Sequence, residues 1–236
     1  MTSSIGLEGV CVRFGRTVAL EPMDATFAPG SMTAVIGENG AGKSTLLRAI
    51  MGLVRLTSGR VRLDGVRRRD IAYLPQAQEI DRSFPIDVTD FVSFGAWPRI
   101  GLTRSLSATE QQKLLAAIER VGLFAERQKA IAQLSGGQFQ RALFARLILQ
   151  DAPILLLDEP FAAVDAKTTA DLTGLLRGWH ADGRTIVAVL HDIGLVEREF
   201  ERTMLLKHGL VAHGPSRVVL ASAIAERQAR ARLVAA

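Results

Sequence analysis

The sequence is poor in cysteine and has no long hydrophobic run. Its single cysteine, Cys11, cannot form an intramolecular disulfide, which suits a reducing cytoplasm. No apolar stretch reaches the roughly eighteen residues that a membrane-spanning helix needs. The most apolar segment, residues 153–157, is short and bounded by Asp151 and Asp158. The amino terminus lacks a basic start followed by an apolar block, so we expect no secretory signal and a protein that stays on the side of the membrane where it is made.

Aromatic residues are also scarce near the positive charge of the chain. The net charge is +5, and arginines concentrate in residues 60–69 and 227–232. Neither cluster is interleaved with aromatic side chains, so solvated surface is the simplest interpretation and no nucleic-acid partner is expected. A weak attraction to an anionic membrane surface is the functional alternative. The hydrophobic content of 48% and charged content of 22% are ordinary for a globular protein.

A glycine-rich segment at residues 37–45, GENGAGKST, satisfies the phosphate-loop pattern G-x-x-x-x-G-K-[ST]. An apolar run precedes it and a helical pattern follows it, which is the context that the motif requires. The glycines permit a tight backbone whose amides face phosphate oxygens, Lys43 reaches the terminal phosphates, and the Ser44 hydroxyl completes a magnesium shell. The predicted nucleotide contacts here are Gly37, Glu38, Asn39, Gly40, Ala41, Gly42, Lys43, Ser44 and Thr45. The motif alone predicts nucleotide binding and does not choose among the many classes that bind nucleotides.

Acidic residues follow a fully apolar strand later in the chain, in the run ILLLDEP. Ligand chemistry gathers at the carboxyl edge of parallel sheets. We therefore expect Asp158 to hold magnesium and Glu159 to polarise the attacking water. His191 follows the apolar strand 186–190, so it is predicted at the same edge, contacting the terminal phosphate and holding Glu159 and the water in line. Gln76, after residues 71–74, is a weaker candidate when taken alone.

The order of these segments predicts an α/β fold. A strand, a phosphate loop and a helix, followed by apolar strands alternating with helices, indicate a phosphate-loop NTPase core with a mostly parallel sheet. Residues 60–63 resemble one arm of an antiparallel hairpin. Capping-box patterns at Ser107 with Glu110 and Ser135 with Gln138 predict helices in an inserted α-helical subdomain. We expect a single domain over residues 1–236, with a core lobe at about 1–77 and 151–236 and a helical subdomain at about 78–150.

The pentapeptide LSGGQ at residues 134–138 distinguishes the chain from other phosphate-loop proteins. With it, the chain resembles the ATP-binding-cassette ATPases over nearly its whole length. Ser135 caps a helix whose glycine-lined amino end is an anion site. In the family this end faces the terminal phosphate of ATP held by a second subunit. The resemblance therefore implies that Ser135, Gly136, Gly137 and Gln138 bind nucleotide across a head-to-tail homodimer.

Other family positions match this sequence residue by residue. Phe14 matches the aromatic residue that stacks on adenine, and Gln76 matches the lid glutamine that senses magnesium and couples to the membrane partner. Asp165 matches the aspartate of the loop that crosses the dimer interface, and His191 matches the switch histidine. The departures are small: Glu38 stands where proline is frequent, phenylalanine replaces the commoner tyrosine at position 14, and residues 161–164 differ from the usual small-residue loop.

A finer resemblance lies in residues 82–102, RSFPIDVTDFVSFGAWPRIGL. The FPI block with the later Gly95 and Gly101 is similar to the zinc/manganese/iron-importer branch, although Gly95-Ala96 replaces the usual Gly-Arg. In the family this region forms the groove that receives the coupling helix of the membrane subunit. The transported metal need not touch the ATPase, and the four histidines and one cysteine of this chain make no ligand cluster.

The resemblance implies an ATPase that uses ATP and Mg²⁺ to power a membrane transporter. The magnesium side would comprise Ser44, Gln76 and Asp158, and the catalytic groups Lys43, Glu159 and His191. Implied partners are a second copy of the chain, integral-membrane permease subunits and a separate extracytoplasmic solute-binding protein. The implied location is peripheral, on the cytoplasmic face of the inner membrane. Import of zinc or manganese is the leading hypothesis. The alternatives are transport of an iron chelate or another substrate, and a soluble non-transport ATPase of DNA repair or translation.

Overall fold

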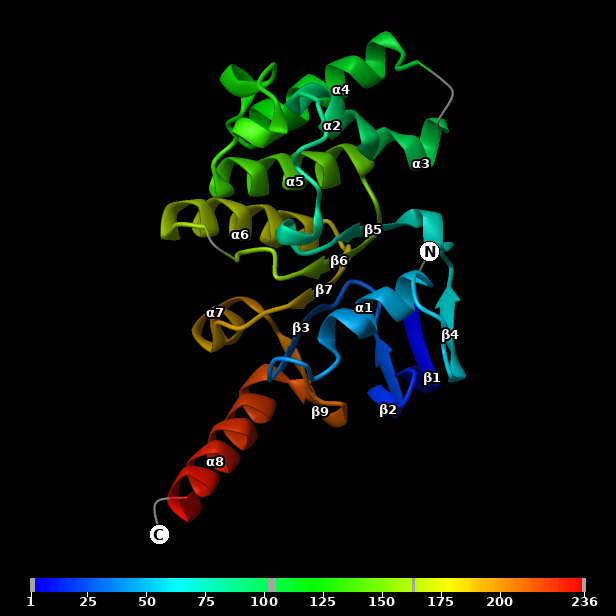
Figure 1. The fold of residues 1–236 in the computed structure, drawn as a ribbon, viewed down its shortest axis with the longest axis vertical. Helices are drawn as coiled ribbons and strands as arrows, with labels where there is room; N and C mark the ends of the chain where they lie inside the picture. The colour runs from blue at the N-terminus through cyan, green and yellow to red at the C-terminus, as the bar shows by residue number, and fades with distance from the viewer. Residues whose placement is uncertain (1–2, 102–104, 163, 235–236) are drawn as a thin grey trace.

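The centre of the molecule is a six-stranded sheet in the order β5-β6-β7-β3-β8-β9 (Figure 1). The computed structural model describes residues 3–101, 105–162 and 164–234, and side chains as far as residue 225. The parallel strands are β3 (Met32–Gly37), β5 (Ile71–Leu74), β6 (Ile154–Asp158), β7 (Thr185–Val189) and β8 (Arg202–Lys207). Strand β9 (Gly209–Pro215) pairs antiparallel with β8. The mostly parallel α/β sheet predicted from the sequence is thus confirmed.

Both faces of this sheet are covered, which explains its unbroken apolar strands. Alternate side chains of each strand point to opposite faces. Helix α1 (Lys43–Met51) and the amino-terminal strands pack on one face, around Val35, Leu156 and Val187. Helices α5 (Gly136–Gln150), α6 (Ala166–Ala181) and α7 (Ile193–Glu199) contribute to the core on the other, around Leu155 and Ala188. Because the sheet packs between two hydrophobic cores, the side chains at its carboxyl edge are held in fixed positions.

A separate antiparallel sheet, the arm, lies beside the core (Figure 1). It consists of β1 (Ser4–Phe14), β2 (Thr17–Phe27) and β4 (Ser58–Asp64) in the order β2-β1-β4. Its inner residues, including Ile5 and Phe27, join the core that contains α1. The arm predicted from residues 60–63 is therefore confirmed, and it is longer and has more strands than that segment indicated.

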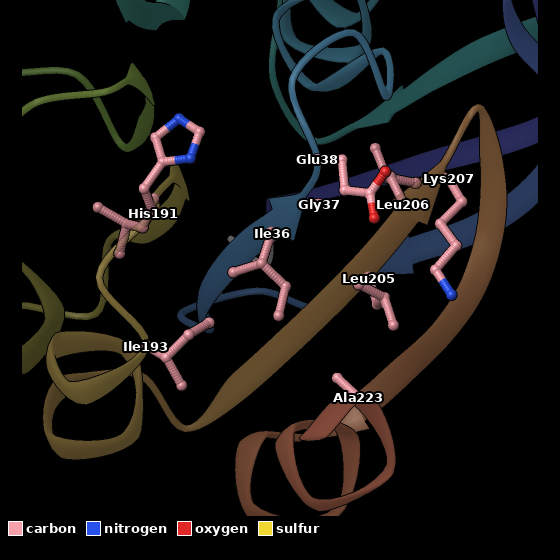
Figure 2. Close-up of a pocket in the computed structure, with 10 residues that line it drawn as sticks. Ile36, Gly37, Glu38, His191, Ile193, Leu205, Leu206, Lys207 and Ala223 are labelled. Carbon is pink, nitrogen blue, oxygen red and sulfur yellow. The ribbon is translucent and has the colours of Figure 1, made fainter. Parts of the chain in front are cut away.

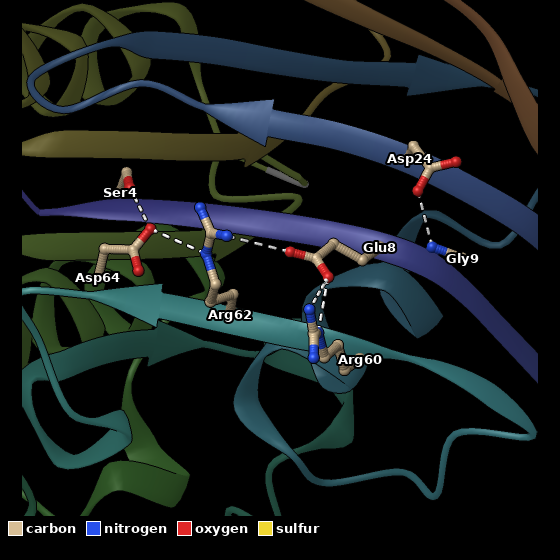
Figure 3. A network of polar contacts seen from close by, with 7 residues as sticks. All are labelled: Ser4, Glu8, Gly9, Asp24, Arg60, Arg62 and Asp64. Carbon is tan, nitrogen blue, oxygen red and sulfur yellow. Dashed lines mark hydrogen bonds and ion pairs between the residues drawn. The ribbon is translucent and has the colours of Figure 1, made fainter.

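Charged side chains form a network on the exposed surface of the arm (Figure 3). The Glu8 carboxylate accepts from Arg60 at 2.6 Å and from Arg62 at 3.2 Å. Asp64 lies 3.2 Å from Arg62 and accepts from the Ser4 hydroxyl at 3.1 Å. These pairs are largely exposed, so each contributes at most about 1 kcal/mol to stability.

The inserted helical lobe begins with the short helices α2 (Val88–Ser93) and α3 (Trp97–Ile100), followed by α4 (Ala108–Arg120) and α5. At α5 the predicted capping box is present, since Ser135 Oγ accepts from the Gln138 amide at 3.2 Å and Gln138 Oε1 accepts from the Ser135 amide at 3.0 Å. At α4 only half of the predicted box forms. Ser107 Oγ caps the Glu110 amide at 3.2 Å, but the Glu110 carboxylate pairs with Arg99 of α3 at 2.6 Å instead.

The remaining elements are short 3₁₀ turns and the last helix. The turns are η1 (Arg68–Asp70), η2 (Ala77–Glu79), η3 (Phe94–Ala96), η4 (Phe124–Glu126) and η5 (Ile131–Gln133). Helix α8 (Ser216–Val234) starts against β8 and α7 and then extends away from the body (Figure 1). Leu102, Ala163 and the side chains of the arginine cluster at 227–232 lie outside the described residues. No helix in the described part of the chain has the length and apolar character to cross a bilayer.

Candidate nucleotide site

The phosphate loop connects β3 to α1 and is held by close backbone contacts. Gly42 precedes the helix with φ of 92°, in the left-handed region that favours glycine. A Cβ at Gly42 would lie 2.4 Å from the Ala19 carbonyl oxygen, and one at Gly37 would lie 2.4 Å from the carbonyl oxygen of Leu206. Both glycines are therefore required by contacts with neighbouring strands as well as by the turn itself.

Lys43 is the buried cation of this loop. Its Nζ donates to the carbonyl oxygens of Gly37 at 3.0 Å and Glu38 at 2.9 Å, so the ammonium points across the loop. Burial lowers the pKa of Lys43, and the nearby carboxylates of Glu159 and Asp158 oppose that shift. A buried ammonium at the amino end of a helix is suited to bind the phosphates of a nucleotide.

Asp158, the last residue of β6, is fully buried. Its Oδ1 accepts from the Ser44 hydroxyl at 3.0 Å, whereas its Oδ2 is buried without a hydrogen-bond partner among the described residues. Burial raises the pKa of Asp158, and hydrogen bonds from Ser44 and Gln76 lower it. An unpartnered buried carboxylate oxygen beside a hydroxyl is costly without a cation. The donor set of hard oxygen atoms fits Mg²⁺.

Glu159, Gln76 and His191 converge from the ends of three neighbouring strands, β6, β5 and β7. Glu159 Oε1 accepts from Gln76 Nε2 at 3.1 Å and lies 2.9 Å from His191 Nε2. Gln76 Nε2 also donates to Ser44 Oγ at 3.3 Å. The backbone of Glu159 has φ of 51°, rare for a residue with a side chain, and its amide donates to the Val189 carbonyl at 3.2 Å. The carboxylate is therefore held by both its backbone and two side chains.

These groups line one pocket of about 620 Å³. Of the predicted residues, the pocket unites Asn39, Gly40, Gly42, Lys43, Ser44, Thr45, Gln76, Glu159 and His191. The sequence analysis missed two lining residues, Ala19 and Gln78. Gln78 donates to Gln76 Oε1 at 3.0 Å. Its position two residues after Gln76 is the sequence feature that could have predicted it at this site. Ala19 comes from the arm and carries no sequence signal, because only tertiary packing brings it here.

A second, apolar pocket of about 360 Å³ shares the lining residue His191 with the first (Figure 2). Most of its lining side chains are aliphatic, and Gly37, Glu38, His191 and Lys207 line it as well. Gly37 and Glu38 therefore line this pocket rather than the 620 Å³ pocket, and Ala41 is buried without lining either. Aliphatic walls are unsuited to a triphosphate, so the larger polar pocket is the candidate nucleotide site.

The structure places the other predicted contacts elsewhere in the chain. Phe14 is 55% exposed at the end of β1 and does not line the polar pocket. The amino end of α5, with Ser135, Gly136, Gly137 and Gln138, is exposed or half-buried and is also outside that pocket.

Asp165 lies next to the amino end of α5. It caps α6 by accepting from the Thr168 amide at 2.8 Å, and these Thr168 hydrogen bonds lower the pKa of Asp165. A Cβ on Gly137 would lie 3.7 Å from Asp165 Oδ2. Arg141 of α5 donates to Thr168 Oγ1 at 3.3 Å and pairs with Asp171 at 2.8 Å. Hydrogen bonds therefore link helix α5 to the loop that contains Asp165. We call the surface formed by residues 135–138 and Asp165 the signature surface.

Comparison with known proteins agrees with this geometry. The family profile described as ABC transporter matches residues 20–162, more than half of the chain. The chain belongs to the ABC transporter family, and its fold is that of the family's ATP-binding cassettes.

Individual relatives cover nearly the whole chain. It is 41% identical over 215 residues to the manganese transport system ATP-binding protein MntB of Listeria innocua, covering 89% of this chain and 90% of that protein. It is 38% identical to the zinc transport system ATP-binding protein TroB of Treponema pallidum, covering 89% of this chain and 81% of that protein.

Among solved structures, the dimeric post-hydrolysis state of the ATP-binding cassette MJ0796 with ADP and phosphate is 27% identical. Its TM-score is 0.74, covering 90% of this chain and 98% of that one. An ABC transporter of metal-chelate type in an inward-facing conformation is 26% identical, with a TM-score of 0.81, covering 92% of this chain and 85% of that one. The structural similarity therefore extends over 90% to 92% of the chain.

Proposed function

We propose that this chain is the ATP-hydrolysing subunit of a metal-ion importer for zinc or manganese, working as a head-to-tail homodimer. The observation that carries the proposal is the separation of the site into two parts. The polar pocket holds the phosphate loop and Glu159, whereas the signature surface lies outside that pocket in the same chain. A second copy placed head to tail would bring its signature surface to the pocket of the first.

Ser44, which lines the pocket, and Asp158, which is buried behind Ser44 and does not line the pocket, would hold Mg²⁺, with Gln76 beside them. When bound, the ion would neutralise charge on the nucleotide phosphates. Lys43 would bind the terminal phosphates. Glu159 would orient the attacking water and accept its proton, and the contact with His191 at 2.9 Å would keep the carboxylate in position. Phe14 would stack on the adenine ring from the arm.

The cargo is inferred from the relatives and not from a site in this chain. Those at 37–41% identity include manganese and zinc transport system ATP-binding proteins. The FPI segment at Phe84 to Ile86 is similar to the same branch and so supports this cargo. It precedes α2 in the helical lobe, where we propose that the permease docks. We propose permease subunits and a separate solute-binding protein as partners, and a peripheral location at the cytoplasmic face of the inner membrane.

The test is reconstitution of the chain with the permease encoded beside its gene and the matching binding protein in vesicles. We expect ATP-dependent uptake of labelled Zn²⁺ or Mn²⁺ that stops with Glu159→Gln. Uptake of an iron chelate, with neither divalent ion carried, would overturn the cargo. Failure of the chain to bind any permease while it hydrolyses ATP would overturn the transport role.

The dimer is tested on the chain alone. With ATP, the Glu159→Gln protein should run at twice its monomer mass in light scattering, because it binds nucleotide without hydrolysing it. Adding Ser135→Arg, which puts a bulky cation on the signature surface, should restore the monomer mass. A doubled mass that persists in the double variant would contradict the head-to-tail arrangement.

A further inference from the structure

The loop that follows β5 is attached to helix α1 at two points. Gln76 donates to Ser44 Oγ at 3.3 Å, and Glu79, at the end of η2, forms an ion pair with Arg48. Ser44 and Arg48 are four residues apart, so they lie one helical turn apart on the same side of α1. The loop therefore runs along the helix of the phosphate loop and is fixed to it near each end.

Tyr73 of β5 lies close to the same ion pair. Its hydroxyl is buried and has no hydrogen-bond partner among the described residues. Burial raises the pKa of the Tyr73 phenol, and the neighbouring Arg48 guanidinium opposes that shift. Arg48 thus lies between a buried phenol and the Glu79 carboxylate, in a defined position rather than free on the surface.

Helix α1 is the rigid member of this arrangement, and the loop is the adjustable one. Leu46, Leu47 and Ile50 of α1 are fully buried against the sheet. The loop is a single 3₁₀ turn in which none of the residues is buried, closed by the Glu79 amide donating to the Gln76 carbonyl at 2.9 Å. Loss of the ion pair would leave α1 in place and release the far end of the loop.

We infer that Arg48 and Glu79 are a positioning pair, which sets where Gln76 presents its amide to Ser44 and Glu159 and so controls binding of the magnesium–nucleotide complex. The inference deepens the proposed function and rests on it, because it takes Ser44 and Gln76 to be the magnesium side of the site. The pair is 35% and 38% exposed, so it adds little to the stability of the fold. Its effect is on geometry.

The arm supplies a matched control. Arg60 and Glu8 form an ion pair of the same type at 2.6 Å, also between exposed side chains, on elements that do not line the polar pocket. Glu8→Gln removes one carboxylate charge from the arm, and Glu79→Gln removes one from the loop. Glu8→Gln controls for the loss of a paired surface carboxylate, and Arg48→Met controls for the direct charge effect of Glu79 on the nearby Asp158, because such an effect would change the magnesium gain in opposite directions in Glu79→Gln and Arg48→Met.

The experiment measures the affinity of the full chain for a fluorescent ATP analogue, with Mg²⁺ and with a chelator in its place. For Glu79→Gln and Arg48→Met we expect the gain in affinity from Mg²⁺ to fall about tenfold, as for other residues that orient metal ligands. Affinity in the chelator and the melting temperature should stay near the wild-type values. The exchange Arg48→Glu with Glu79→Arg should recover most of the gain, and Glu8→Gln should leave it unchanged.

Two outcomes separate the inference from the function on which it rests. A normal magnesium gain in Glu79→Gln and Arg48→Met, with the wild type showing that gain and hydrolysing ATP, would overturn the positioning pair alone. Absence of any magnesium gain or ATP hydrolysis in the wild type would overturn the proposed function. An equal loss of the gain in Glu8→Gln would show a general charge effect and would also overturn the pair.

Discussion

Polar side chains differ in exposure and in pairing between the arm and the carboxyl edge of the central sheet. On the arm, Glu8, Asp64, Arg60 and Arg62 are at least partly exposed and each faces an opposite charge, as Glu8 does with Arg60 and Arg62. At the sheet edge, Asp158 is fully buried with one oxygen atom lacking a hydrogen-bond partner among the described residues. Ion pairs between exposed side chains need no ligand to account for them. A buried polar group without a partner carries a desolvation cost that a bound ligand would offset, so it indicates a binding site.

The largest effect should come from the sheet edge. Glu159→Gln removes the carboxylate that we propose accepts a proton, and the turnover number should fall by about 10² to 10⁴. Nucleotide affinity should change little, because Lys43 and the loop amides remain. Steady-state hydrolysis and a binding titration check both statements. Turnover within tenfold of the wild type would remove Glu159 from the proposed role.

A backbone change in the arm should affect stability instead. Gly59 has φ of 78°, and a Cβ there would lie 2.2 Å from the carbonyl carbon of Gly9. Gly59→Ala should therefore destabilise the chain by about 2–4 kcal/mol, measured by urea unfolding. Gly15→Ala is the control, because its φ is 59° but no atom lies within 4 Å of the added Cβ. It should cost only about 1 kcal/mol. Equal losses would show that the close approach of β4 to β1 is unimportant.

In the proposed function, Phe14 of the arm contacts the nucleotide that the sheet edge binds. Phe14→Ala should weaken ATP binding by about 1–3 kcal/mol, the usual range for a base stacked on an aromatic ring. Phe14→Tyr should bind as the wild type does, since it keeps the stacking face. Titrations with ATP and with inorganic triphosphate separate the contributions, because only ATP offers a base. Equal weakening for both ligands would contradict adenine stacking.

A smaller, pH-dependent effect is expected where the arm contacts β9. His213 packs against Phe27 at 5.8 Å, and burial, assisted by Arg202, lowers the pKa of His213 below 6.5. The unfolded chain then binds this proton more strongly than the folded chain, so stability falls as the pH drops below about 6.5 towards the folded pKa. His213→Phe should lose less stability than the wild type between about pH 7.5 and about pH 5.5 in urea unfolding. An equal loss would exclude this histidine as a source of the pH dependence.

The smallest effect should come from the surface network of the arm. Glu8→Gln breaks the contacts with Arg60 and Arg62, yet we expect a loss of at most about 1 kcal/mol in unfolding free energy. The difference should shrink further in high salt, which screens exposed charges. A loss above about 2 kcal/mol would show that this network supports the arm as strongly as packing does, and the contrast drawn above would fail.

The sequence predicted the fold class and most of the polar pocket because those features are local. A phosphate loop, an apolar strand ending in Asp158 and Glu159, and the LSGGQ cap are each contained in a few consecutive residues. The failures involve distant partners. Glu110 does not complete its capping box because Arg99 of α3 competes for it, and Ala19 lines the pocket because β2 packs against the phosphate loop. The roles assigned to Phe14, Asp165 and the signature residues stay predictions.

The bonds within the signature surface determine how it can move. Arg141 ties α5 to Thr168 of α6, and Thr168 ties to Asp165, so the helix end and the aspartate loop are linked as one block. In the proposed dimer, a single displacement of this block would bring both parts to the neighbouring pocket together and withdraw both together. The two hydrogen bonds would thus favour making or losing both contacts with the neighbouring chain in one movement.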